Sequence, residues 1–253
     1  MTTARLAHIV RHPVKSAGFQ MLDRAVLTQD RPLPFDRAWA IRTEGANFDG
    51  SPDGWVAKMS FVRGAAEGSL QAIRADFDDE TGRIRLTHPG LSPFTGTLPG
   101  DGPALVDWLR PLWPASRPAP AALVARKDGG ALTDVPGAWV AVLNLASLRA
   151  LGQRMDCDLS IHRFRGNLWL GGLTAWEEFD LIGREVAVGA ARLRIEQRIT
   201  RCVATTFDPE TGKPGGDTLA ALESGWGHRD FGVYASVTQG GTIRPGDRVE
   251  ILR

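Results

Sequence analysis

The thiol of Cys202 is the side chain in this sequence whose setting most suits reactive chemistry. It lies in the segment Gln197-Arg-Ile-Thr-Arg-Cys-Val-Ala-Thr-Thr206, with Arg201 before it and Arg198 four residues back. Neighbouring positive charge is expected to favour the thiolate. The segment reads as the end of a strand followed by a turn, a position from which a side chain can meet a ligand. A buried, inert cysteine is the alternative interpretation.

Basic and amide side chains suited to a phosphate group and a heterocycle lie elsewhere in the chain. Lys15 and Ser16 offer a cation and a hydroxyl directly after a predicted strand. Arg37 and the segment Arg163-Phe-Arg-Gly-Asn167 add guanidinium groups, which match phosphate oxygens in bidentate fashion, and an amide, which can read the edge of a heterocycle. Each group alone also fits a solvated salt bridge. The case for ligand binding therefore depends on their joint occurrence with Cys202.

Several other chemistries are disfavoured. Cys157 stands between Asp156 and Asp158, whose charges oppose thiolate formation, so we expect it to be a weak nucleophile. The chain has no GxxxxGK[ST], GxSxG or HExxH motif and no paired CxxC. No lysine has a context that points to a pyridoxal phosphate Schiff base, so that cofactor is not supported. The histidines are not spaced along the chain as metal ligands usually are; they are His8, His12, His88, His162 and His228.

Composition describes an ordinary globular protein. The chain has 253 residues, 30 Lys+Arg, 29 Asp+Glu and 43% hydrophobic residues, enough apolar material for a sizeable core. A formal charge of +1 gives no electrostatic reason to expect nucleic acid or an anionic membrane as a partner. Two cysteines exclude a disulfide-rich scaffold, and the longest apolar run, near residues 139–148, is too short to span a bilayer. We expect a cytoplasmic protein.

Frequent turns separate many short strands, since 29 glycines and 16 prolines are spread along the chain. Short helices are expected over Ala104–Leu112, after Asn144 to about Met155, and over Asp217–Glu223. Strands are expected at Leu6–Val10, Met21–Thr28, Arg37–Thr43, Leu70–Phe77, Arg83–His88, Trp139–Leu143, Asn167–Leu170, Glu185–Val188, Leu193–Ile199, Gly232–Val237 and Arg248–Leu252.

A proline-rich segment divides the chain. Four prolines in residues 111–120 can continue neither a helix nor a central strand, so we place a boundary there, between residues 1–115 and residues 121–253. No regular βαβ alternation is present, which disfavours a Rossmann-type sheet. The predicted fold is mainly β with some α, an α+β protein of two packed β-barrel-like halves with short peripheral helices.

Taken in order, these segments resemble the MOSC family, the domain found at the C-terminus of molybdenum cofactor sulfurases, together with its N-terminal β-barrel companion. Pro13-Val-Lys-Ser16, Asp36-Arg-Ala-Trp39 and Phe164-Arg-Gly-Asn167 are similar to the family's PVKS, DR.W and FRPN motifs, with Gly166 in place of the usual proline. Thr200-Arg-Cys202 and Gly241–Asp247 are similar to its cysteine segment and closing strands.

The resemblance implies a molybdenum cofactor, in which a pterin dithiolene holds the metal and the pterin carries a phosphate. By that analogy Cys202 is the metal ligand and catalytic residue, and a soft sulfur ligand suits such a site. The residues implied to hold the phosphate or pterin are Lys15, Ser16, Arg37, Arg165, Asn167, Thr200 and Arg201.

The family members most similar in motif are amidoxime-reducing components and bacterial reductases of N-hydroxylated bases. The resemblance therefore implies an oxidoreductase that reduces N-hydroxylated or N-oxide compounds, small molecules, with the cofactor supplying the redox chemistry. The chain ends at Arg253 without a cysteine cluster, so electrons are expected from a separate ferredoxin-, flavin- or cytochrome b5-type protein. The alternative is a non-catalytic carrier of the cofactor, or of sulfur as a Cys202 persulfide.

Overall fold

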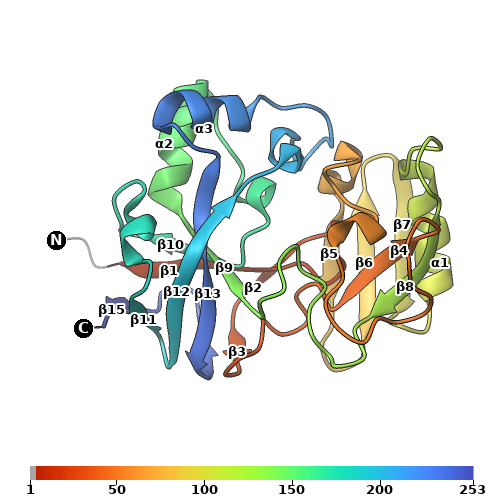
Figure 1. Cartoon of the computed structure of the whole chain (residues 1–253), viewed down its shortest axis with the longest axis horizontal. Coiled ribbons are helices and arrows are strands. Elements are labelled where there is room, and N and C mark those ends of the chain that lie inside the picture. Colours follow the sequence, from red (N-terminus) through yellow and green to blue (C-terminus); the bar gives the residue numbers. More distant parts are fainter. Residues whose placement is uncertain (1–3, 253) are drawn as a thin grey trace.

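An eight-stranded sheet forms one of two lobes, and strands from both ends of the chain contribute to it (Figure 1). The computed structural model describes residues 4–252. Neighbouring strands are antiparallel except for β9 and β10, which are parallel. The order along the sheet is β15 (Val249–Ile251), β11 (Glu185–Val188), β12 (Ala191–Thr200), β13 (Asp230–Gln239), β9 (Val140–Asn144), β10 (Leu168–Gly171), β1 (Arg5–Arg11) and β2 (Gln20–Leu22).

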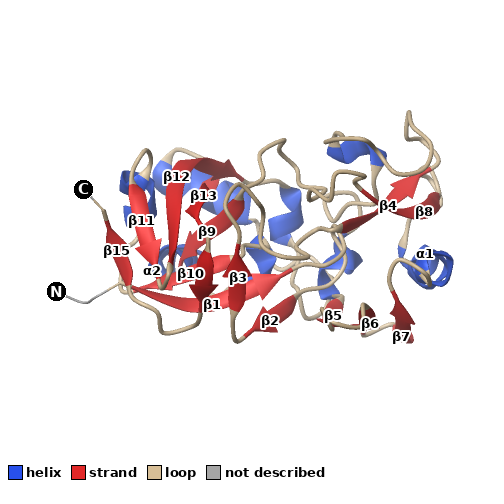
Figure 2. Ribbon diagram, turned by 90° about the horizontal axis from the view of Figure 1, so that it is seen from below, coloured by secondary structure: helices blue, strands red, loops and turns tan. Residues whose placement is uncertain are grey.

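The second lobe contains two smaller sheets. One pairs β4 (Trp39–Thr43) with β8 (Pro120–Ala125), and the other has the order β5 (Arg74–Phe77), β6 (Arg83–His88) and β7 (Leu91–Thr97). Helix α1 (Gly102–Leu109) packs against β7 and β8. A separate ribbon of β3 (Ala25–Leu27) and β14 (Gly241–Ile243) lies with the first lobe. Loops and short helices fill most of the space between the lobes (Figure 2).

Alternation of apolar and charged residues explains the large sheet. In β12, Ala191, Leu193 and Ile195 are buried, whereas Arg192 and Arg194 are exposed, as expected for a strand with one face on a core. The apolar face joins one cluster that also contains Leu6 of β1 and Val233 of β13. Residues more than 180 positions apart therefore share one core.

The predicted α+β class is confirmed, but the prediction of two β-barrel-like halves is wrong. Within residues 4–252, the large sheet stays open with β15 and β2 at its edges, although one bridge joins Arg5 to Arg248. The other lobe splits into separate sheets. Pro93 in β7 and Pro120 in β8 have no backbone N–H to extend a ladder, and α1 packs between these two strands.

Most predicted elements exist, with changed bounds. The strand expected at residues 21–28 is broken between β2 and β3, and the first part of the one expected at residues 70–77 is the 3₁₀ helix η2 (Gly68–Ala72). Strands β7 and β8 were not predicted, whereas β14 lies in the segment that resembles the family's closing strands. No helix among the described residues is long and apolar enough to cross a bilayer.

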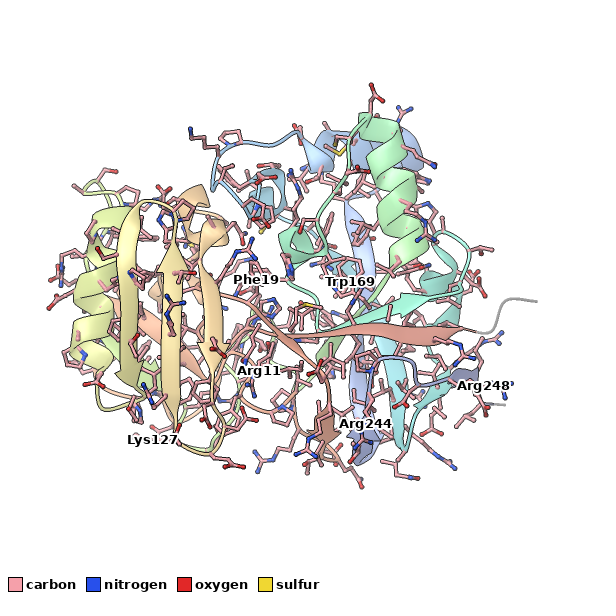
Figure 3. All side chains as sticks on the ribbon, turned by 180° about the vertical axis from the view of Figure 1, so that it is seen from behind. Arg11, Phe19, Lys127, Trp169, Arg244 and Arg248 are labelled. Atoms are coloured by element: carbon pink, nitrogen blue, oxygen red, sulfur yellow. The ribbon has the colours of Figure 1, made fainter. Side chains whose placement is uncertain are left out.

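Strand pairing crosses the predicted boundary between residues 1–115 and 121–253, which itself stays a prediction. Strands β1 and β2 belong to the sheet of the later residues, and β8 pairs with β4 in the earlier lobe. Phe19, between β1 and β2, stacks on His162 with ring centroids 3.7 Å apart at the junction of the lobes (Figure 3). The chain thus passes between the lobes several times, which fixes the junction where the candidate site lies.

Both predicted N-caps in the first lobe are confirmed. Asn144 accepts a hydrogen bond from the backbone N–H of Ala146 at the start of α2 (Leu145–Met155). Asp217 does the same for α3 (Thr218–Trp226). Asn144 also donates to the fully buried Glu178, whose pKa is raised by burial.

We expect Asp217→Ala to lower the free energy of unfolding by about 1 kcal/mol, because it removes only a cap. Asn144→Ala should cost more, about 2–3 kcal/mol, because it also removes a donor to buried Glu178. Urea denaturation of both variants at pH 7 measures the difference. Equal losses would show that the contact with Glu178 adds nothing to stability.

Candidate anion-binding site between the lobes

A cavity of about 310 Å³ lies where the lobes meet, and all eight residues that the sequence singled out line it. They come from four separate segments of the chain. They are Lys15, Ser16, Arg37, Arg165, Asn167, Thr200, Arg201 and Cys202. Other wall residues come from the segment Lys58–Ala65, from residues 133–135, and from strands β12 and β13.

The loop after β1 and the loop before β4 are fastened to each other on one side of the cavity. The backbone N–H of Lys15 donates to the carbonyl of Trp39 at 2.7 Å, and that of Arg37 donates to the carbonyl of His12 at 2.6 Å. Ser16 and Arg37 have φ values of 63° and 50°, in the left-handed region that non-glycine residues seldom adopt. Such conformations occur where surrounding structure enforces them, often at binding sites.

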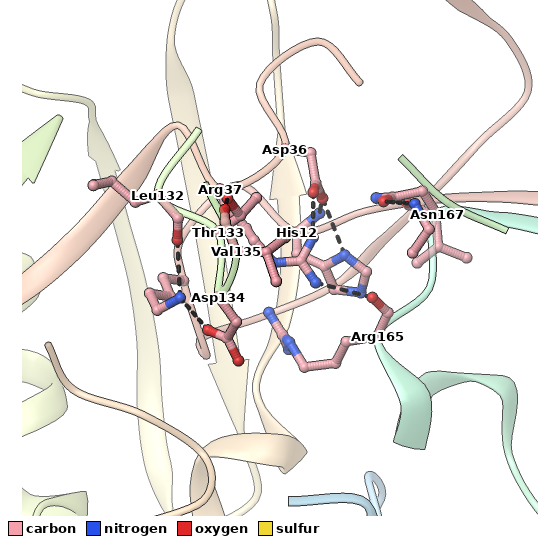
Figure 4. A network of polar contacts seen from close by, with 12 residues as sticks. His12, Asp36, Arg37, Leu132, Thr133, Asp134, Val135, Arg165 and Asn167 are labelled. Atoms are coloured by element: carbon pink, nitrogen blue, oxygen red, sulfur yellow. Dashed lines mark hydrogen bonds and ion pairs between the residues drawn. The ribbon is translucent and has the colours of Figure 1, made fainter. Parts of the chain in front are cut away.

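Asp36 organises the polar network behind the cavity wall (Figure 4). Its carboxylate accepts a hydrogen bond from the backbone N–H of His12, faces the His12 ring, and forms an ion pair with Arg37. Burial alone would raise the pKa of Asp36, but Arg37 and His12 outweigh it and hold the pKa well below its usual range. Burial lowers the pKa of His12 to about 3, so the ring is neutral at pH 7.

Lys15 ties the loop after β1 to residues 132–134 from within the cavity wall. Its side chain is 3% exposed, and its Nζ donates to the Leu132 carbonyl at 2.9 Å and to Asp134. Burial lowers the pKa of Lys15, while Asp134 opposes that shift. Asp134 was not among the predicted site residues, because nothing in its local sequence distinguishes it from a surface carboxylate.

Arg165 is a half-buried guanidinium with little to balance its charge. It has φ 47° and donates one hydrogen bond, to the Gly18 carbonyl at 3.2 Å, while its own carbonyl accepts from Arg37 at 2.9 Å. Burial lowers the pKa of Arg165 to about 9, and the charge of Arg37 adds to the effect. No carboxylate in residues 4–252 lies within ion-pair distance of it. An anion in the cavity would supply the missing charge.

Arg201 and Asn167 are engaged more fully by the protein itself. Arg201 donates to the carbonyls of Phe164 and Phe231, and burial lowers its pKa to about 10. The Asn167 amide accepts from the backbone N–H of Ala141 at 3.0 Å and donates to the Val10 carbonyl at 3.2 Å. Asn167 therefore joins β1 to β9, and only its remaining hydrogen-bonding capacity is open to a ligand.

Cys202 lies at the end of β12, half-buried, and precedes the 3₁₀ helix η6 (Val203–Thr206). Thr205 donates to its carbonyl through both the backbone N–H and the hydroxyl. The helix is held from the other lobe by Gln71, whose amide donates to the Ala204 carbonyl at 3.0 Å. Beside it, the hydroxyl of Thr200 donates to Asp230 at 2.6 Å.

Positive charge dominates the cavity although the whole chain is nearly neutral. Its wall carries a single carboxylate, Asp134, against eight basic side chains. These are Lys15, Arg37, Lys58, Arg63, Arg163, Arg165, Arg198 and Arg201. Low-dielectric walls strengthen the resulting potential. The arrangement is suited to a ligand with several negative charges.

Comparison with known proteins agrees with this chemistry. The model of the MOSC domain matches residues 131–250. Residues 131–250 form a MOSC domain. Mitochondrial amidoxime-reducing component 1 of Mus musculus is 32% identical over 125 residues, covering 44% of this chain and 36% of that protein. Molybdenum cofactor sulfurase of Drosophila grimshawi is 29% identical over 134 residues, covering 50% of this chain and 17% of that protein.

This chain therefore spans about a third of the length of the amidoxime-reducing relative that it matches. Among solved structures, the YUAD protein of Bacillus subtilis aligns with a TM-score of 0.47 and 11% identity, covering 98% of this chain and 95% of that one. The MOSC domain contributes Arg165, Asn167, Thr200, Arg201 and Cys202 to the cavity, and the residues before it contribute the rest.

Gly166 in the MOSC domain packs directly against the side chain of Leu143. A Cβ built on Gly166 would lie 2.2 Å from Leu143 Cδ1, and one on Gly232 would lie 2.7 Å from Leu143 Cγ. Leu143 is fully buried, so two glycines make room for its side chain. This packing accounts for a glycine at the position where the resemblance leads us to expect proline.

Tyr234 is a cavity residue that the sequence did not reveal. It lies on β13, lines the cavity in the MOSC domain, and its pKa is raised by burial. Its being the single tyrosine of the chain was the one sequence feature that could have marked it, but its neighbours form an ordinary strand pattern.

Within residues 4–252 no group of three His, Cys, Asp or Glu side chains is placed to hold a metal ion. A metal at this site would need ligands from its own cofactor.

Burial of neutral His12 predicts acid sensitivity. As the pH falls from about 7 to 4.5, the unfolded chain protonates His12 near its ordinary pKa of 6.5, whereas the folded chain stays neutral until about pH 3. The unfolded state binds more protons in this window, so the free energy of unfolding decreases as the pH falls.

We therefore expect His12→Asn, which can preserve a donor near Asp36, to weaken this dependence by up to about 1.4 kcal/mol per pH unit. Urea denaturation between pH 7 and 4.5 measures it. His162, whose pKa burial lowers to about 4, contributes equally to both proteins. Parallel pH profiles would show that His12 is not the titrating group.

Proposed function

We propose that this protein is a molybdenum-cofactor-binding oxidoreductase that reduces N-hydroxylated or N-oxide compounds. The observation that carries the proposal is the basic cavity between the lobes, with the Cys202 thiol in its wall. The MOSC domain and the partial likeness to amidoxime-reducing components support it. The overall reaction consumes two electrons and two protons for each N–O bond cleaved and releases water.

The donor set fits the proposed cofactor at both of its ends. A phosphate needs donors with unbalanced positive charge, and Arg165 lacks a carboxylate partner while Lys15 and Arg37 lie in the same wall. A metal bound by a dithiolene could take a thiolate from the protein as a further ligand, and Cys202 is the one cysteine that lines the cavity. When bound, the cofactor supplies the two-electron redox chemistry.

The chain's own residues would act by binding and orientation. Lys15, Ser16 and Arg37 would hold the phosphate and pterin from the residues before the MOSC domain, and Arg165, Thr200 and Arg201 would hold them from the MOSC domain. Asp36 keeps Arg37 ionised and fixed, since it forms an ion pair with that guanidinium behind the wall. Asn167 acts mainly by holding β1 against β9, and only its remaining hydrogen-bonding capacity would reach the cofactor.

Electrons would come from a separate ferredoxin-, flavin- or cytochrome b5-type protein. The cytoplasmic location expected from the sequence also stays a prediction. The amidoxime-reducing relatives, by contrast, are named as mitochondrial proteins. Bound cofactor without turnover of any N–O compound would favour the alternative, a carrier of the cofactor or of sulfur on Cys202.

Replacing the two cysteines separates a ligand from a surface thiol. We expect Cys202→Ser to abolish reduction of benzamidoxime with reduced methyl viologen as donor, and to lower the molybdenum content measured by mass spectrometry. Cys157→Ser is the matched control, because Cys157 is exposed and lies outside the cavity. Similar losses from both changes would remove Cys202 from the proposed role.

Removing Arg165 tests phosphate binding. We expect Arg165→Ala to weaken retention of the cofactor about 10- to 100-fold, through loss of a charge-assisted contact worth about 1.5–3 kcal/mol. Retained pterin after gel filtration, measured by fluorescence of its oxidised form, gives the readout. Arg194→Ala removes the same charge from an exposed position on β12 and should have no effect. Unchanged retention in Arg165→Ala would contradict the assignment.

A further inference from the structure

The cavity contains more positive charge than a single phosphate requires. Of its eight basic side chains, five have a carboxylate within ion-pair distance, and four of these pairs are Lys15 with Asp134, Arg37 with Asp36, Arg163 with Asp208 and Arg198 with Asp230. Lys58 shares Asp134 at 3.9 Å. Within residues 4–252, Arg63, Arg165 and Arg201 have none.

These three arginines differ in how the protein satisfies them. Arg201 donates to two backbone carbonyls, and Arg165 donates to one. The guanidinium of Arg63 contacts only the thioether of Met59, a weak acceptor. Arg63 is thus the cavity arginine whose hydrogen-bonding capacity the protein uses least.

Arg63 and Arg165 reach the cavity from different lobes. Arg63 follows the segment that pairs with β4 through the Arg42–Phe61 bridge, whereas Arg165 lies in the MOSC domain. Arg63 precedes Gly64, and a Cβ built on Gly64 would lie 3.1 Å from the Gln71 amide nitrogen and 3.8 Å from the Cβ of Ala204. The backbone next to Arg63 therefore packs against Ala204, two residues after Cys202.

We propose that Arg63 binds an anionic group of the substrate, so that the preferred substrates are N–O compounds that also carry a carboxylate. The inference rests on the proposed function for the identity of the reacting group. A guanidinium binds a carboxylate through two parallel hydrogen bonds. A free carboxylate on the substrate would place its N–O group in the same cavity as Cys202.

The test compares ligands that differ only in a carboxylate. The reaction product 4-amidinobenzoate, a zwitterion, and its counterpart without the carboxylate, the benzamidinium cation, are titrated into the molybdenum-loaded protein by calorimetry, which requires no turnover. We expect the carboxylate to improve binding at least about tenfold at low salt and less at high salt. In Arg63→Gln this preference should fall to near unity, and Arg63→Lys should retain part of it.

Arg85→Gln is the matched control, because Arg85 is an exposed arginine on β6 in the same lobe and outside the cavity. It should leave the preference unchanged. Equal binding of the two ligands by the unaltered protein, or an unchanged preference in Arg63→Gln, would overturn the inference.

Turnover of benzamidoxime and 4-carboxybenzamidoxime separates this inference from the proposed function. Reduction of both with equal kcat/KM would overturn the substrate preference and leave the reductase function standing. Arg63-dependent binding without reduction of either compound would overturn the reductase function and leave the anion site standing.

Discussion

Unbalanced positive charge in a low-dielectric junction is the physical constraint on which this structure depends. Burying a guanidinium without a counter-ion is costly, and the cost falls when an anion is supplied from outside. Arg165 illustrates this, since its pKa is lowered to about 9 and its one donated hydrogen bond goes to a carbonyl. Asp36 pairs with Arg37 and Asp134 pairs with Lys15, whereas the charge of Arg165 is left for a ligand to balance.

The strand pattern explains how such a junction is kept in place. Because β1 pairs with β10 of the MOSC domain and β2 pairs with β1, the loop that carries Lys15 is fixed at both of its ends to that lobe. The same loop is bonded to the segment before β4, which leads into the other lobe. The cavity is therefore built from loops anchored on both sides. A ligand that contacts Lys15 and Cys202 would bind across the two lobes.

The sequence predicted the local features that depend on residue type. Asn144 and Asp217 cap helices as expected, because a short polar side chain before an apolar helix has few other roles. It also predicted eight residues that the fold brings to one cavity. The sequence did not predict β7 and β8, because both contain proline, which is uncommon inside strands. It wrongly predicted barrel-like halves, because closure of a sheet depends on pairing between residues far apart in the sequence. Three cavity residues were not predicted, because their importance comes from neighbours that are distant in the sequence. They are Asp134, Arg63 and Tyr234.

The close packing around Leu143 limits which residues can occupy the neighbouring position 166. With Gly166 and Gly232 both pressed against one leucine, position 166 cannot gain a bulkier residue while that leucine keeps its present rotamer. A larger residue at position 166 therefore requires a smaller or shifted side chain at position 143. The residue at one of these positions limits the choice at the other, although they are 23 positions apart in the sequence.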